Sequence, residues 1–199
     1  PAQIEVIHLG VDLDRYRPSG TRRPGDPFIL LFVGTGWERK GLEFAIRALA
    51  RLPGRVRLRV YGKGRVGRYR RLARQLGCDS RLEFRGVASD MPRVYAEGHL
   101  LVHPAIYEPF GNVCLEAMAC GLPLVTSRFT GAAELVEPRR NGWVVEDPAD
   151  IASMVAGIEC FLGAEQWATA SRAARATAEA HPFSRNVEQT LAFIQRIVG

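Results

Sequence analysis

Short apolar segments alternate with amphipathic segments along the chain, and this alternation restricts the fold more than any other feature of the sequence. Phe28–Val33 (FILLFV) is apolar at every position, which is typical of a strand buried on both faces. Leu42–Leu52 follows with apolar residues at helical spacing, and Val56–Tyr61 has the pattern of the next strand. Repeated β–α units form a parallel sheet with helices on both faces. The sequence therefore predicts an α/β, Rossmann-like domain whose ligands bind at the carboxyl ends of the strands.

The remaining segments continue this order. Further strands are predicted at Ile4–His8, Leu82–Phe84, Leu100–His103, Leu124–Ser127 and Trp143–Val145. Helices or helical turns are predicted at Tyr69–Leu76, Met91–Ala96, Val113–Cys120, Ala132–Leu135, Ala149–Leu162, Glu165–Ala180 and Asn186–Val198. Pro18–Pro27 is rich in turn residues and is expected to be a connector.

The composition limits the classes of partner. Lys and Arg number 27 against 21 Asp and Glu, a net charge of +6, which suits a phosphate-bearing partner or an anionic membrane surface. The charge is too modest and too dispersed to indicate nucleic acid. The chain has no apolar run of about 18 residues, the length of a membrane-spanning helix. Its four cysteines follow no CxxC spacing, so we expect reduced thiols in a cytoplasmic protein.

One basic cluster stands out within this composition. It comprises Arg65, Arg68, Arg70, Arg71 and Arg74. A solvated helix face is the first interpretation of such a cluster, and peripheral contact with an anionic membrane surface is the second.

A glycine-rich segment follows the strand at Val56–Tyr61. Gly62–Gly67 (GKGRVG) matches the GxGxxG pattern of dinucleotide-binding proteins, and Glu83 lies about where the ribose-binding acid belongs. The match is on the second core strand, however, whereas that pattern normally follows the first. A glycine turn is therefore the preferred interpretation, and NAD binding remains the alternative.

A second glycine-rich segment, Gly34–Gly41 (GTGWERKG), follows the most apolar strand. It is not a P-loop, because no Ser or Thr follows Lys40. Glycines allow backbone N–H groups to approach an anion, and Arg39 and Lys40 stand at the start of a helix, where the helix dipole already favours negative charge. The two cations could clamp a diphosphate, although a solvated, charged helix start fits the segment equally well.

The most specific segment is residues 103–123, HPAIYEPFGNVCLEAMACGLP. It contains two acids with seven residues between them: Glu108 in a loop at the end of a strand, and Glu116 on the following helix. The helix start at Phe110–Val113 lies between them and offers free N–H groups. A carboxylate accepts two hydrogen bonds at once, which suits vicinal hydroxyls. Two such acids with an anion site between them fit a nucleotide-sugar.

Residues 108–123 (EPFGNVCLEAMACGLP) resemble the EPFGxxxxEAMAxGxP signature of the family-four retaining glycosyltransferases, which have the GT-B fold. Ile4–Pro18 is similar to the interdomain entry segment of that family, FVGTGWERKG to its phosphate loop, and YGKG with LEFRG to its nucleoside side. The finer pattern is most similar to bacterial lipopolysaccharide-core hexosyltransferases. The resemblance implies that residues 1–182 form the nucleotide-sugar-binding domain, with 1–27 as entry segment and connector. It also implies that residues 183–199 form a helix crossing back to an N-terminal acceptor domain outside this chain.

The resemblance assigns roles to the matching residues. Glu108 would bind hydroxyls of the donor sugar, Glu116 would bind the ribose diol, and Lys40 and Arg39 would stabilise the leaving diphosphate. Backbone groups would hold the sugar at Phe110, Gly111 and Asn112, and the phosphates at Val113 and Cys114. The other donor-binding positions are Gly34, Thr35, Gly36, Gly62 and, beside the base, Arg85. Thr35 departs from the family pattern, in which an arginine commonly follows the first glycine.

The predicted function is therefore retaining transfer of a hexose from an NDP-sugar, with a UDP-sugar expected first, to a hydroxyl of a glycan or lipid-linked glycan. The family usually needs no metal, and His99 and His103 share a strand face without an obvious third ligand, so no metal site is expected. We expect this chain alone to bind donor and to transfer nothing. Two alternatives remain: a non-catalytic NAD- or nucleotide-binding module, and half of a sugar-nucleotide epimerase.

Overall fold

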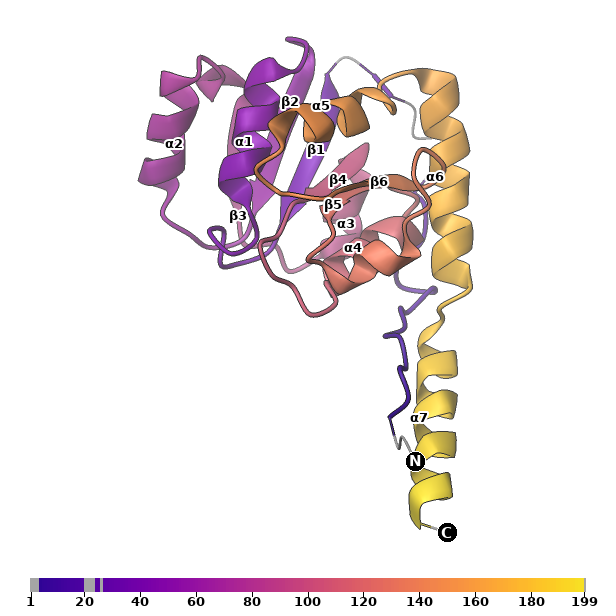
Figure 1. Ribbon diagram of the computed structural model, residues 1–199. Helices are drawn as coiled ribbons and strands as arrows, with labels where there is room; N and C mark the ends of the chain where they lie inside the picture. The colour runs from indigo at the N-terminus through magenta and orange to yellow at the C-terminus, as the bar shows by residue number, and fades with distance from the viewer. Residues whose placement is uncertain (1–3, 20–23, 26, 199) are drawn as a thin grey trace.

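The computed structural model describes residues 4–19, 24–25 and 27–198, and within them it contains one six-stranded sheet in which all paired strands are parallel (Figure 1). The strands are β1 (Phe28–Val33), β2 (Val56–Tyr61), β3 (Leu82–Gly86), β4 (Leu100–His103), β5 (Leu124–Ser127) and β6 (Gly142–Val145). The α-helices are α1 (Leu42–Arg51), α2 (Val66–Gln75), α3 (Met91–Ala96), α4 (Asn112–Ala119), α5 (Ile151–Glu159), α6 (Ala164–Glu179) and α7 (Phe183–Val198). Short 3₁₀ turns occupy Asp79–Arg81 and Gly131–Leu135. The predicted α/β, Rossmann-like fold is confirmed.

The order in which strands are added to the sheet reverses between β1 and β4. The strand order is β3-β2-β1-β4-β5-β6, so the chain first builds outward from β1 and then returns to its other side. The connections that leave β1 and β4 therefore diverge, and in sheets of this kind that divergence places the ligand-binding crevice at the carboxyl ends of the two strands. The loops after Val33 and His103 meet at this crevice.

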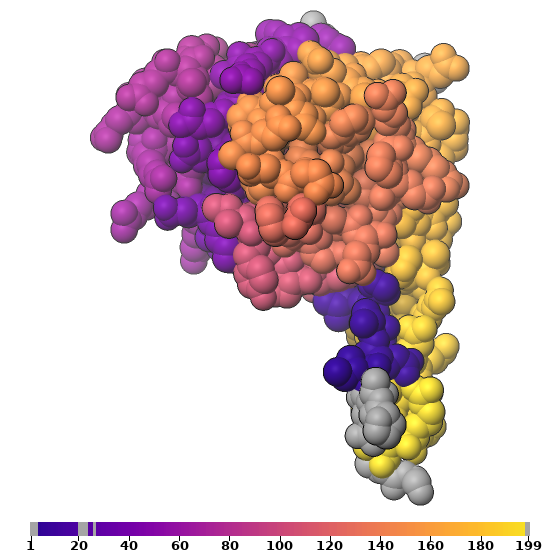
Figure 2. All heavy atoms as spheres, viewed as in Figure 1, coloured from indigo at the N-terminus to yellow at the C-terminus, as the bar shows by residue number. Residues whose placement is uncertain are grey.

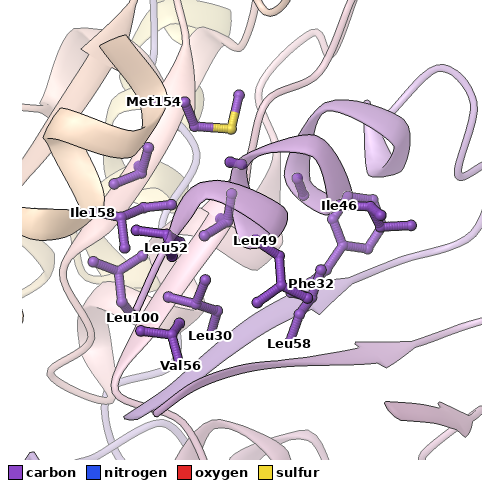
Figure 3. Packing of buried hydrophobic residues seen from close by; sticks show 14 of the residues in the cluster. Leu30, Phe32, Ile46, Leu49, Leu52, Val56, Leu58, Leu100, Met154 and Ile158 are labelled. Atoms are coloured by element: carbon purple, nitrogen blue, oxygen red, sulfur yellow. The ribbon is translucent and has the colours of Figure 1, made fainter. Parts of the chain in front are cut away.

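Strand β1 separates two hydrophobic cores, and each of its six residues is buried, as predicted. Phe28, Leu30 and Phe32 belong to the core beneath α1 and α5. The intervening residues of the strand belong to the core beneath α3 and α4. Figure 3 shows side chains of α1 and α5 packed over the sheet; the labelled residues include Ile46, Leu49, Met154 and Ile158.

Helix α7 and the N-terminal segment project together from this body (Figures 1 and 2). The two are joined at their base, because the Val11 N–H donates to the His181 carbonyl at 3.0 Å and the Phe183 N–H donates to the Val11 carbonyl at 3.0 Å. Apolar residues of α7 remain exposed along the projection, among them Leu191 and Ile194. In the described part of the chain, no helix combines the length and apolar character needed to cross a membrane.

The prediction of a strand at Ile4–His8 is wrong. The alternating pattern there fits a strand, but among the described residues no strand pairs with this segment, and the nearest pairing is an isolated bridge from Val11 to Pro182. Three helices also differ from the prediction by two or more residues at an end: α2 and α7 each begin three residues earlier, and α5 is shorter at both ends. Of the predicted connector Pro18–Pro27, residues 20–23 and 26 lie outside the described residues.

Candidate active site

The loop after β1 is folded tightly at the crevice. Gly34 and Gly36 have φ angles of 130° and 73°, which residues with a side chain rarely adopt. Trp37 fixes this turn from beneath: its indole Nε1 donates to the Gly34 carbonyl at 2.9 Å, and the side chain is buried. The Arg39 carbonyl accepts from the Ile106 N–H at 2.8 Å, which ties this loop to the loop after β4.

Two cations of this loop contact Glu108, although they are separated from it by 68 and 69 positions in the sequence. Lys40 Nζ lies 2.8 Å from Glu108 Oε2, and Arg39 Nη1 lies 3.4 Å from the same oxygen. Arg39 also donates to the Tyr107 carbonyl at 2.5 Å. In the described part of the chain, no hydrogen bond or ion pair reaches Glu108 Oε1. The structure therefore brings together the three residues predicted as catalytic, with one carboxylate oxygen engaged and the other open.

A buried histidine completes this group. His103 ends β4, is fully buried, and places its Nε2 3.7 Å from Glu108 Oε2. The His103 imidazole, followed by Lys40 and Arg39, lowers the pKa of Glu108 from 4.5 to about 2, against the opposing effect of burial. Burial in turn lowers the pKa of His103, so its ring is neutral at pH 7.

The segment from Glu108 into α4 presents open backbone donors. Its carbonyls are anchored: Gly131 N–H donates to the Glu108 carbonyl at 3.0 Å, and Ala132 N–H donates to the Phe110 carbonyl at 2.8 Å. Gly111, with φ 88°, caps α4. Among the described residues, no hydrogen bond is made by the N–H groups of Phe110, Gly111, Asn112 and Val113. The Cys114 N–H is bonded to the Gly111 carbonyl at 2.8 Å. This arrangement is suited to an anion.

Glu116 is half-buried on α4, one helical turn or more behind this helix start. Its Oε2 accepts a hydrogen bond of 2.7 Å from the hydroxyl of Tyr95, which is fully buried in α3. Burial, and then the neighbouring Glu116 carboxylate, raise the pKa of Tyr95, so this hydroxyl stays protonated and donates. A second tyrosine, Tyr16, also lies beside this carboxylate: burial, and then Glu116, raise the pKa of the Tyr16 hydroxyl.

Two further predicted positions lie at the periphery. Arg85 is exposed in a shallow hollow of about 290 Å³ whose wall also contains Tyr61, Val87 and Asp90. Its guanidinium is held by Glu83 at 3.5 Å and Glu97 at 3.9 Å. Thr35 is exposed at the crevice. Cys114 is buried inside α4 and its N–H is engaged by the Gly111 carbonyl, so neither its side chain nor its backbone donor is open to a phosphate.

The glycines of GKGRVG are explained by packing. A Cβ on Gly62 would come within 2.0 Å of the Gly34 carbonyl oxygen, and one on Gly64 within 2.2 Å of the Trp37 ring. A Cβ on Gly67 would meet no atom within 4 Å. These contacts are made with the neighbouring loop, so the segment needs no bound dinucleotide to account for its first two glycines.

Sequence reasoning missed three residues of the site. Trp37 supports the glycine loop, Tyr95 orients Glu116, and His103, which was weighed as a metal ligand, faces Glu108. Only His103 carried a signal, since it lies at the carboxyl end of a central strand. The other buried histidine, His99, is structural: its Nδ1 accepts from the Ile29 N–H at 2.9 Å. Within the described residues, no cluster of side chains could hold a metal ion.

Comparison with known proteins places this site in a family. The family model described as glycosyl transferases group 1 matches residues 27–162. The D-inositol 3-phosphate glycosyltransferase 2 of Catenulispora acidiphila is 35% identical over 183 residues, which cover 79% of this chain and 43% of the relative. The chain thus spans less than half the length of this curated relative.

Solved structures agree with this match. Anabaena Alr3699/HepE, in complex with UDP and glucose, superposes with a TM-score of 0.81 at 27% identity, over 94% of this chain and 56% of that chain. WaaG, a glycosyltransferase involved in lipopolysaccharide biosynthesis, superposes with a TM-score of 0.82 at 26% identity, over 94% of this chain and 55% of that chain. The family model covers well over half of the sequence and includes Arg39, Lys40, Glu108 and Glu116. The chain belongs to the group 1 glycosyltransferases.

Proposed function

We propose that this chain is the donor-binding part of a glycosyltransferase that takes a hexose from an NDP-sugar and transfers it, with retention at the anomeric carbon, to an acceptor hydroxyl. The observation that carries the proposal is the meeting of Arg39, Lys40 and Glu108 beside the open N–H groups of residues 110–113. A UDP-sugar is the first candidate, because the similar Alr3699/HepE structure contains UDP and glucose.

The chemistry assigns a task to each group. Negative charge builds on the leaving diphosphate, and fixed cations and backbone donors stabilise that charge most effectively when they are already in place. Arg39, Lys40 and the start of α4 would do this. Glu108 would accept hydrogen bonds from the sugar hydroxyls, and Glu116 from the ribose diol. We assign no general base to this chain, since the departing phosphate itself can take the acceptor proton.

The acceptor side of the reaction is proposed on the same basis. The acceptor would be a glycan or lipid-linked glycan, as expected for a relative of an enzyme of lipopolysaccharide biosynthesis. It would be held by an N-terminal domain, toward which α7 would cross, and the protein would work in the cytoplasm without a metal. The arginines of α2 would be its contact with an anionic membrane surface. Arg68 and Arg74 already pair with acids, and Arg70 lies over the Phe84 ring, which leaves Arg65 and Arg71 for that contact.

Two alternative functions are less well supported. A dinucleotide-binding module would use GKGRVG to approach a pyrophosphate, but Gly62 and Gly64 pack against Gly34 and Trp37 instead. Half of a sugar-nucleotide epimerase would share the architecture, but the family match is to glycosyltransferases.

Calorimetric titration of this chain with UDP-glucose, ADP-glucose, GDP-mannose and NAD tests the proposal. We expect an NDP-sugar to bind most tightly, Glu116→Ala to weaken that binding, and the chain alone to transfer no sugar. Tighter binding of NAD that is insensitive to Glu116→Ala would support the dinucleotide-binding module. Turnover by the chain alone would refute the need for a separate acceptor domain.

A further inference from the structure

Buried polar atoms without a hydrogen-bond partner are concentrated at one place in this molecule. In the described part of the chain they are both ring nitrogens of His103 and Oγ1 of Thr130. Both residues adjoin Glu108: His103 Nε2 lies 3.7 Å from its carboxylate, and Thr130 forms a backbone bridge with it. Orphaned polar atoms are costly in a folded protein and commonly mark a functional site.

The His103 ring is held rigidly. It stacks on the buried ring of Phe32, with centroids 6.4 Å apart and an angle of 27° between the planes. Its backbone carbonyl accepts two hydrogen bonds, from Thr126 Oγ1 at 2.8 Å and from the Ala105 N–H at 2.9 Å. The two carbonyl bonds fix the main chain of His103, and complete burial against Phe32 restricts the ring, whose Nε2 faces Glu108.

At 3.7 Å the imidazole is close enough to stabilise the Glu108 anion but lies beyond the length of a fully formed hydrogen bond. The competing cations explain this distance. Lys40 and Arg39 contact the same oxygen, Oε2, at 2.8 and 3.4 Å. In the proposed function these two cations bind the donor diphosphate, which carries more charge than one carboxylate. Glu108, whose side chain is 13% exposed, would then lose both partners within a poorly hydrated site.

We propose that His103 is a positioning residue that acts once the donor diphosphate has bound Lys40 and Arg39. Its Nε2–H then donates a hydrogen bond to Glu108 Oε2, and this bond keeps Oε1 directed at the sugar. The inference rests on the proposed function and adds to it a residue that acts through Glu108. It requires a carboxylate movement of under about 1 Å, enough to bring the two atoms to the usual hydrogen-bond length. It also requires the neutral tautomer protonated at Nε2.

The test compares UDP-glucose with UDP in calorimetric titrations of the unmodified chain and three variants. His103→Phe keeps the ring shape on Phe32 but removes the donor, and His103→Gln restores an N–H donor near the Nε2 position. His99→Phe is the matched control, because it alters a buried histidine that stacks on Phe28 and does not contact Glu108. Thermal unfolding of each variant is followed in parallel.

We expect His103→Phe to weaken UDP-glucose about 10-fold, the effect of one hydrogen bond to a charged acceptor. The affinity for UDP should fall less than about 3-fold, because water can hydrate Glu108 when no sugar is bound. His103→Gln should recover most of the loss, and His99→Phe should leave the ratio of the two affinities unchanged even if it lowers the melting temperature.

Two results would overturn the inference while the proposed function stands: equal weakening of both ligands by His103→Phe, or no weakening of UDP-glucose. Lack of rescue by His103→Gln in a folded protein would count against the donor role as well. If the unmodified chain binds neither UDP-glucose nor UDP, the proposed function fails, and the inference is overturned with it.

Discussion

The hydroxyl of Tyr95 donates a 2.7 Å hydrogen bond to Oε2 of Glu116, and so a fully buried side chain of α3 holds a half-buried carboxylate of α4. Glu116→Ala should therefore have two effects. It should weaken UDP binding by about 10-fold or more, and it should lower stability by about 1–3 kcal/mol, because the buried Tyr95 hydroxyl loses its acceptor. Calorimetry and thermal unfolding measure the two effects separately.

Glu116→Gln distinguishes these effects in one side chain. Its amide oxygen can still accept from Tyr95, but its NH₂ group would meet the ribose hydroxyls as a donor. We expect stability near that of the unmodified chain, together with weakened UDP binding. Unchanged UDP affinity in this variant would contradict the ribose-binding role of Glu116.

Glu108 should make stability depend on pH in the acid range. Its pKa is lowered from 4.5 to about 2 in the folded state, first by His103 and then by Lys40 and Arg39. The ionised carboxylate therefore stabilises the fold fully above pH 4.5, and this contribution is lost as the pH falls from about 4.5 to about 2. Glu108→Gln should be about 1–3 kcal/mol less stable at pH 7, and the difference should shrink toward pH 3 in urea unfolding. A difference that does not change with pH would show that Glu108 is not held as an anion by these neighbours.

Lys40 and Lys63 are the only lysines in the sequence, and they form a matched pair. Lys40 is largely buried against Glu108, whereas Lys63 is exposed in the loop after β2. Lys40→Ala should lower the affinity for UDP at least about 10-fold, since it removes a charge-assisted contact to phosphate. Lys63→Ala should change the affinity by less than about 2-fold. Similar losses in both variants would indicate a diffuse electrostatic effect rather than a phosphate site at Lys40.

Gly64 and Gly67 provide a test of the glycine-rich turn. Gly64→Ala places a Cβ 2.2 Å from the Trp37 ring and should lower the free energy of unfolding by about 1–3 kcal/mol. Gly67 lies in the first turn of α2 with open space around it, so Gly67→Ala should raise stability by up to about 1 kcal/mol. Urea unfolding measures both. Loss of nucleotide binding in folded Gly67→Ala would revive the dinucleotide interpretation.

The sequence predicted the layers of the fold, and it singled out Arg39, Lys40 and Glu108, which the structure brings together. β1 was clear because six consecutive apolar residues fit few environments other than the centre of a sheet. Glu108 and Glu116 were found because they lie in one short segment, and Arg39 and Lys40 because they follow a glycine turn.

The remaining features depend on contacts between distant segments. Trp37 reaches back beneath the Gly34 loop, Tyr95 meets Glu116 from another helix, and His103 differs from the structural His99 only in what the fold places beside it. The error at Ile4–His8 has the same origin. An alternating pattern forms a strand only where a partner strand is present, and in the described ranges of the chain no strand pairs with this segment.

The paired bonds between Val11 and residues 181–183 have a mechanical consequence. The chain enters and leaves the sheet-containing body at one point, so the two ends of the body are held together by these hydrogen bonds. A force applied to the two ends would therefore act on these two hydrogen bonds and on the bond from Asn186 Nδ2 to the His8 carbonyl, which join the same two segments. For the same reason, residues 11–183 could be transplanted as a single insertion into a surface turn of another protein, with both junctions side by side.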